Sequence, residues 1–122
     1  MSIFIQNSPL SLAQMQQFHA AFDLEKKFDQ DIIRNIAYLA EEVGELSAAI
    51  RHLLNQLDES ERADAHQAVG SELADCLAYI CKLANLNNVD LERAYRQKML
   101  RNTKRNWSRP TDVQIEPEET TD

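Results

Sequence analysis

Apolar residues recur every three to four positions over four segments of the chain, which is the spacing of one face of an α-helix. Ser11 can cap the first of these helices, and Asp90 can cap the last. The four predicted helices cover about residues 11–22, 29–57 or 31–57, 65–86 and 91–106. The pattern therefore predicts an all-α fold, a bundle of four to five helices.

The stretches between these helices are polar. We expect residues 22–29 to form a connector, residues 58–64 to form a loop, and Asn87-Asn88 to end the third helix. The second helix carries a broad apolar stripe and is expected to be a core element whose Glu42 and Glu45 are partly buried. Residues 1–106 are predicted to form one domain, and residues 107–122 a disordered acidic tail.

Composition supports this assignment. Of 122 residues, 43% are hydrophobic and only 2 are glycine and 3 proline, which favours helices over a sheet protein rich in turns. The net charge of −7 argues against a nucleic-acid-binding surface. No signal peptide or membrane-spanning apolar run is visible, and Cys76 and Cys81 lie at a spacing that cannot bridge within one helix. We therefore expect a cytoplasmic protein without membrane association.

Two pairs of acidic residues are the main candidates for chemistry. Glu42 and Glu45 lie three residues apart, as do Glu72 and Asp75, so each pair shares one face of its helix. Neither these four acids nor Glu41 has a Lys or Arg three or four residues away, although the chain holds 13 basic residues. If the two helices pack face to face, four carboxylates converge.

Converging carboxylates repel one another, by roughly 4 kcal/mol for a pair about 4 Å apart at an effective dielectric constant near 20. Such a cluster protonates, separates or binds a cation, and we expect a cation. Because no His or Cys belongs to the set, the ligands suit Mg²⁺ or Mn²⁺ rather than Zn²⁺. Bound Mg²⁺ usually contacts substrate phosphates, so the cluster also predicts a phosphorylated ligand.

The fourth predicted helix carries a basic face that suits such a ligand. Lys98, Asn102 and Arg105 recur at helical spacing, and their side chains are suited to phosphate and sugar groups. The alternative is that basic residues near a helix C-terminus only complement the helix dipole. His19 on the first helix is likewise open between a structural role and a place near a substrate.

Glu41-Glu42-x-x-Glu45 followed by Glu72-x-x-Asp75 resembles the signature of the all-α nucleoside triphosphate pyrophosphohydrolases, the MazG-type family. The resemblance covers about residues 30–106. It implies a MazG-type fold, a homodimer or homotetramer, and Mg²⁺ ligation by Glu42, Glu45, Glu72 and Asp75. It further implies that Glu41 or Glu45 activates water, and that Lys98, Asn102 and Arg105 in the basic C-terminal helix contact the substrate. Some relatives enclose the base with a Trp-containing segment, for which this chain has Phe22 and Phe28.

The implied reaction is hydrolysis of an NTP or dNTP to the monophosphate and pyrophosphate. Three alternatives remain at this point. The first is a related phosphoribosyl-ATP pyrophosphatase, and the second is a non-catalytic helical module that binds metal or nucleotide. The third is a partner-binding bundle whose acidic faces are solvated. Only the last predicts that divalent ions leave thermal stability unchanged.

Overall fold

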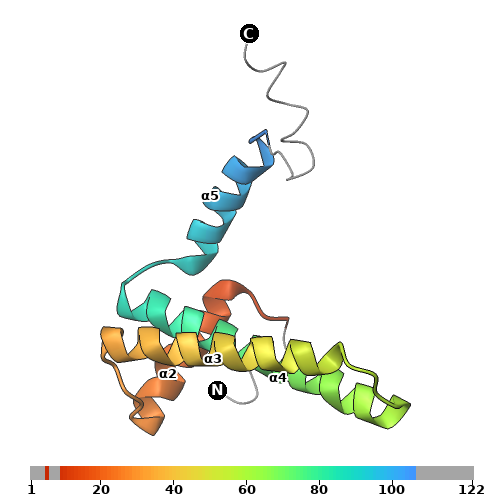
Figure 1. The fold of residues 1–122 in the computed structure, drawn as a ribbon. Coiled ribbons are helices and arrows are strands. Elements are labelled where there is room, and N and C mark those ends of the chain that lie inside the picture. The colour runs from red at the N-terminus through yellow and green to blue at the C-terminus, as the bar shows by residue number, and fades with distance from the viewer. Residues whose placement is uncertain (1–4, 6–8, 107–122) are drawn as a thin grey trace. The chain divides into compact units, whose positions relative to one another are not determined.

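The protein is described here from a computed structural model, which describes residue 5 and residues 9–106 (Figure 1). The predicted acidic tail, residues 107–122, lies outside the described residues. The all-α prediction is confirmed, since four α-helices and no strand occur in the described part of the chain. The helices are α2 (Leu12–Lys26), α3 (Ile32–Leu53), α4 (Glu59–Leu86) and α5 (Leu91–Thr103).

Helix α2 continues past Phe22, its last predicted residue. The apolar spacing ends at Phe22, but the helical backbone continues to Lys26. Ser11 and Gln14 form a capping box at its start, with Gln14 N–H donating to Ser11 Oγ at 3.1 Å. At its end, Lys27 adopts the left-handed conformation (φ 56°), and Phe28 N–H donates to Asp23 O at 3.0 Å. The connector therefore starts at Lys27, five residues later than predicted.

The prediction of a loop at residues 58–64 is wrong, because α4 already begins at Glu59. Asp58 is the N-cap of α4 and forms a capping box with Glu61, whose N–H donates to Asp58 Oδ1 at 2.8 Å. Helix α3 ends earlier than predicted, at Leu53. Arg62 on α4 donates to Leu53 O at 3.2 Å and to Asn55 O at 3.3 Å, so the freed carbonyl groups are satisfied.

Helices α3 and α4 lie side by side and form the main contact of residues 1–92, and α2 packs against α4 (Figure 1). Gln16 fixes the second contact. Its amide nitrogen donates to Asn85 Oδ1 at 3.0 Å and to Val89 O at 2.8 Å, and Asn85 Nδ2 donates back to Gln16 O at 3.0 Å. These bonds hold α2 against the C-terminal end of α4.

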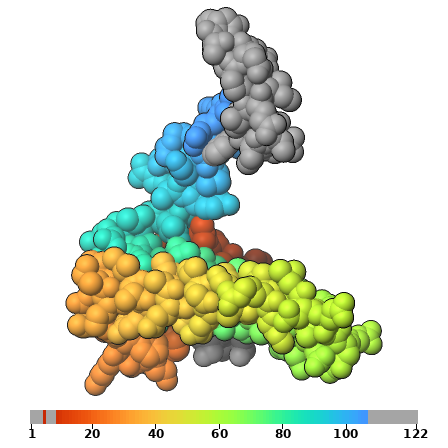
Figure 2. All heavy atoms as spheres, in the orientation of Figure 1, coloured from red at the N-terminus to blue at the C-terminus, as the bar shows by residue number. Residues whose placement is uncertain are grey.

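The apolar stripe of α3 is largely exposed in the single chain. Ile33, Ile36 and Val43 are 73%, 51% and 47% exposed, and Leu73 on α4 is 52% exposed. Figure 2 shows the outer side of α3, coloured orange to yellow, uncovered along its length. The prediction that α3 is a core element is therefore wrong for the single chain, because its apolar stripe is broader than the side that contacts α4.

The described residues fall into two units, divided between Glu92 and Arg93, and most of α5 belongs to the second. Within that unit, Lys104 and Arg105 N–H groups donate to the carbonyls of Arg101 and Asn102, three residues back. This tighter turn ends the α-helix at Thr103, before the predicted end at Asn106. None of the helices in the described ranges is long and apolar enough to cross a membrane.

Candidate active site

Three of the four predicted metal ligands come together where α3 and α4 pack. One carboxylate oxygen from each of Glu42, Glu45 and Glu72 lies within 4.8 Å of the other two. Asp31 caps α3 and Asp58 caps α4, and both acidic pairs lie in the interior of these regular helices. We refer to Glu42, Glu45 and Glu72 as the acidic cluster.

The remaining predicted acids lie near the acidic cluster but outside that distance. Asp75 is exposed, yet its negative charge contributes to raising the pKa of Glu42. Glu41 is also exposed, and its charge acts on the Tyr38 hydroxyl. Glu45 is exposed as well, which contradicts the expectation that it is partly buried, whereas Glu42 is half-buried as expected.

The electrostatics of the acidic cluster centre on Glu42. Burial raises the pKa of its carboxyl group above the usual 4.5, and the charges of Glu45, Asp75 and Glu72 raise that pKa further. Oε1 of Glu42 and Oε1 of Glu72 are buried and have no hydrogen-bond partner among the residues that the structure describes. A buried carboxylate oxygen without a partner is costly, so these two atoms need a proton or a cation.

This donor set fits a hard divalent cation. Carboxylate oxygens are the ligands that Mg²⁺ and Mn²⁺ prefer, and the two buried oxygens without partners supply them. Cys76 on α4 is buried beside the acids. Burial and the charges of Glu42, Glu72 and Asp75 raise its pKa, so the neutral thiol is favoured, and a neutral thiol is a poorer candidate ligand than the carboxylates.

A pair of tyrosines connects the acidic cluster to a pocket. The rings of Tyr38 on α3 and Tyr79 on α4 lie 6.1 Å apart between centroids. Burial raises the pKa of Tyr79, and the charge of Glu42 contributes to the same rise, which puts that tyrosine beside the acids. Tyr38 and Tyr79 also line a pocket of about 320 Å³. The pocket residues are His19, Phe22, Asp23, Phe28, Asp29, Tyr38, Ala78, Tyr79 and Lys82.

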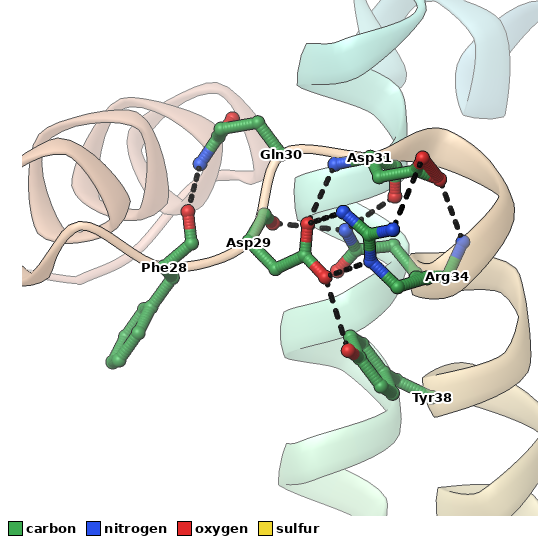
Figure 3. A network of polar contacts seen from close by, with 7 residues as sticks. Phe28, Asp29, Gln30, Asp31, Arg34 and Tyr38 are labelled. Carbon is green, nitrogen blue, oxygen red and sulfur yellow. Dashed lines mark hydrogen bonds and ion pairs between the residues drawn. The ribbon is translucent and has the colours of Figure 1, made fainter.

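A network around Asp29 fixes one wall of this pocket (Figure 3). The Asp29 carboxylate accepts hydrogen bonds from Arg34 at 2.6 and 3.1 Å, from the Asp31 N–H at 3.0 Å and from the Tyr38 hydroxyl at 3.0 Å. Chiefly the Arg34 hydrogen bond holds the pKa of Asp29 well below its usual range. Asn35 is buried, and its side-chain amide donates to the carbonyls of Asp29 and Asp31 at 2.9 and 2.7 Å. The network therefore orients the Tyr38 ring.

The pocket is also lined by a buried charged pair. Asp23 on α2 and Lys82 on α4 are only 6% and 7% exposed, and Lys82 Nζ lies 3.8 Å from Asp23 Oδ2. His19 lies alongside, half-buried, and burial lowers its pKa. The sequence left open whether His19 has a structural role or lies near a substrate. In the structure, His19 lines this pocket.

The predicted substrate-binding residues lie in the second unit. Lys98 and Arg105 are exposed, and Asn102 is half-buried with its amide nitrogen 3.7 Å from Met99 Sδ. Because α5 ends at Thr103, Arg105 does not continue the helical face of Lys98 and Asn102 as expected. The role of these three residues in substrate binding stays a prediction.

Sequence reasoning missed the pocket's charged pair. Asp23 was assigned to the connector, but it lies on α2. Lys82 follows Cys81 within an apolar stretch of α4, and a lone lysine there is the signal that would have drawn attention to it. The cysteine prediction is confirmed, since Cys76 and Cys81 are free thiols.

Comparison with known proteins agrees with this geometry. No curated protein matches the chain. Residues 30–108 match the family described as the MazG nucleotide pyrophosphohydrolase domain, and this range contains all of α3, α4 and α5. The matched range is well over half of the chain and includes every acid of the candidate site. The chain therefore belongs to the MazG nucleotide pyrophosphohydrolase family.

Proposed function

We propose that this protein hydrolyses a nucleoside or deoxynucleoside triphosphate to the monophosphate and pyrophosphate, with Mg²⁺ or Mn²⁺ as cofactor. One observation carries the proposal: a cluster of carboxylates, two of whose oxygens are buried without a hydrogen-bond partner in the described part of the chain, lies beside an aromatic-lined pocket. The cluster suits a cation that binds phosphates, and the pocket suits a nucleobase. Family membership supports pyrophosphohydrolase chemistry.

Glu42, Glu45, Glu72 and Asp75 are the proposed metal-holding residues. Glu42 and Glu72 offer their buried oxygens, Glu45 completes the acidic cluster, and Asp75 acts on it from nearby. A bound divalent ion would neutralise phosphate charge and lower the pKa of an attacking water. The carboxylates alone cannot bind a triphosphate, because like charges repel.

Glu45 and Glu41 are the proposed catalytic bases. A general base must reach the water that attacks the α-phosphorus, and it must be ionised at the working pH. Glu45 is exposed and belongs to the acidic cluster, so its carboxylate lies at the edge of the site, where solvent water can reach it. Glu41 is exposed on α3, directly before Glu42, and suits the same role.

The substrate's phosphates and sugar are proposed to contact Lys98, Asn102 and Arg105. Lysine and arginine side chains donate hydrogen bonds to phosphate oxygens, and an amide can pair with a sugar hydroxyl. We also propose a homodimer or homotetramer in the cytoplasm. The exposed apolar residues of α3 and α4 support self-association, because a second copy would remove them from water.

The test is release of pyrophosphate from a panel of canonical and modified NTPs and dNTPs, with and without Mg²⁺. We expect activity that needs the metal and that Glu42→Gln or Asp75→Asn abolishes while the helical circular dichroism spectrum persists. Glu59→Gln is the matched control, because Glu59 is exposed on α4 and lies about 20 Å along the helix from Glu72.

Two other outcomes would redirect the proposal. Turnover of phosphoribosyl-ATP in preference to all NTPs would identify the related pyrophosphatase. Binding of Mg²⁺ and nucleotide without pyrophosphate release across the whole panel would identify a non-catalytic module, and the proposed reaction would be wrong.

A further inference from the structure

The pocket beside the acidic cluster has the size and walls of a site for a single aromatic ring system. Its volume of about 320 Å³ lies at the lower end of the range of about 300–1,000 Å³ for small-molecule sites. Phe22 and Phe28 meet edge to face with centroids 5.4 Å apart, and Tyr38 and Tyr79 form the wall nearest the acids. Such walls stack on a nucleobase without distinguishing one base from another.

Two carboxylates line this pocket, and they differ in the number of hydrogen bonds that they accept. Asp29 accepts four hydrogen bonds, so it has little capacity left for a ligand. Asp23 is more deeply buried, and within the described residues its carboxylate accepts no hydrogen bond. Its charged neighbour is Lys82, at 3.8 Å, which is beyond hydrogen-bonding distance.

The ammonium group of Lys82 is likewise buried without a hydrogen bond among the described residues. Its ammonium group carries three donors and is 7% exposed, yet in the described part of the chain it makes no hydrogen bond. Its other close neighbour is the face of Phe28, 5.5 Å from Nζ to the ring centroid. A buried ion pair that serves stability alone is expected to be hydrogen-bonded, because each unmet donor or acceptor carries a desolvation cost.

We propose that Asp23 and Lys82 determine base specificity by reading the hydrogen-bonding edge of the nucleobase. The pair offers one acceptor and one donor next to each other in an aromatic pocket, which matches a base edge where an N–H lies beside a carbonyl oxygen or ring nitrogen. The N–H donates to Asp23, and Lys82 donates to the neighbouring oxygen or nitrogen. This inference rests on the proposed function, since it assigns the pocket to the base of the same substrate.

The test separates base recognition from hydrolysis. Binding of non-hydrolysable α,β-methylene triphosphates is measured by calorimetry for the four common bases. Each is compared with a counterpart whose edge is altered: 3-methyluracil, 2-pyrimidinone, unsubstituted purine and 1-methylguanine. We expect the wild-type protein to prefer at least one common base over its counterpart by about 10- to 150-fold, the range for hydrogen bonds to charged groups.

Variants identify the residues responsible. Lys82→Met and Asp23→Asn should reduce that preference to less than about threefold while binding of the altered counterpart changes little. The double variant Asp23→Asn/Lys82→Met covers the case in which one unpaired buried charge prevents folding, because it removes both charges. Lys26→Met is the matched control, since Lys26 is exposed on α2 and lines no part of this pocket.

The outcomes distinguish this inference from the proposed reaction. An unchanged preference in the double variant, or equal binding of every base and its counterpart by the wild type, would overturn the inference. So would an equal loss for all analogues together with a lower melting temperature, because that result indicates a structural pair. Selective binding without any pyrophosphate release from the parent triphosphates would support the inference and overturn only the reaction.

Discussion

Glu42→Gln should stabilise the metal-free protein and remove its thermal response to Mg²⁺. The carboxylate oxygens of Glu42, Glu45 and Glu72 lie within 4.8 Å of one another. At that separation two unit charges repel by about 3.5 kcal/mol at an effective dielectric constant of 20, and by about 0.9 kcal/mol in water. Glu42 and Glu72 are half-buried and Glu45 is exposed, so the two values bracket the repulsion on Glu42, and the charge of Glu45 contributes more to its raised pKa than that of Glu72.

The gain is smaller than the full repulsion, because Glu42 relieves part of it by taking up a proton. We therefore expect the metal-free variant to be more stable by about 1–4 kcal/mol, which corresponds to a rise in melting temperature of at least about 4 °C for a domain of this size. The wild-type protein at a Mg²⁺ concentration ten times its dissociation constant should gain about 1.4 kcal/mol. That gain corresponds to about 6–11 °C, and Glu42→Gln should lose it.

The pH dependence has a definite sign. The pKa of Glu42 is higher in the folded protein than its usual 4.5, so the folded state binds more protons than the unfolded state above pH 4.5. The stability of the metal-free wild type should therefore fall as pH rises from 4.5 through the folded pKa. The other acids facing Glu42 are Glu45, Glu72 and Asp75, and their charges act in the same direction.

Scanning calorimetry between pH 4.5 and 8, with EDTA or with Mg²⁺, measures all three effects. The difference between Glu42→Gln and the wild type should shrink toward pH 4.5, and the Mg²⁺ shift should shrink with it. Glu59→Gln should keep the full Mg²⁺ shift. A metal-free Glu42→Gln protein that is less stable than the wild type at pH 7.5, or that keeps the whole Mg²⁺ shift, would refute the electrostatic reasoning.

Three further predictions follow from other parts of the structure. Gly44→Ala should stabilise the isolated chain by about 1 kcal/mol in urea denaturation, because a Cβ there has no atom within 4 Å; a loss of stability with dissociation would instead place a second copy against α3. Arg34→Gln should lower the melting temperature above about pH 4 and have less effect at lower pH. The reason is that Arg34 lowers the pKa of Asp29 in the folded protein, so the ionised Asp29 stabilises the fold above pH 3.8, and this stabilisation is lost as the pH falls through the pKa of Asp29 in the folded state. Cys76 and Cys81 should react with a thiol reagent far more slowly in the native protein than in urea, since burial raises the pKa of both thiols; rapid native labelling at pH 8 would contradict their burial.

Local sequence signals identified the helices better than their ends. Ser11 was correctly predicted as a cap because its side chain acts within one turn. The same kind of signal was misread at Asp58 and Glu61, where clustered acids suggested a loop but form a capping box. Both interpretations fit the residue types, and only the backbone conformation separates them. At the end of α3, the carbonyl of Leu53 accepts a hydrogen bond from Arg62 on the following helix, a contact that no local signal predicts.

The three-residue spacing of the acids fixed what each helix contributes. Helical periodicity alone places Glu42 with Glu45 and Glu72 with Asp75, so the sequence determined two acidic faces. Whether the faces meet depends on how α3 and α4 rotate about their own axes when they pack. The tertiary structure brings Glu42, Glu45 and Glu72 together and leaves Asp75 outside that distance, because side-chain packing sets the rotation.

The pocket was beyond the reach of sequence reasoning for a related reason. Asp23 and Lys82 lie on different helices, and no periodicity relates residues so far apart in the chain. Helix type, acidic spacing and family follow from the sequence, because they depend on local periodicity and residue chemistry. The three-acid contact, the exposed side of α3 and the charged pair beside the aromatic rings were decided only by tertiary packing, because it sets which helix faces meet.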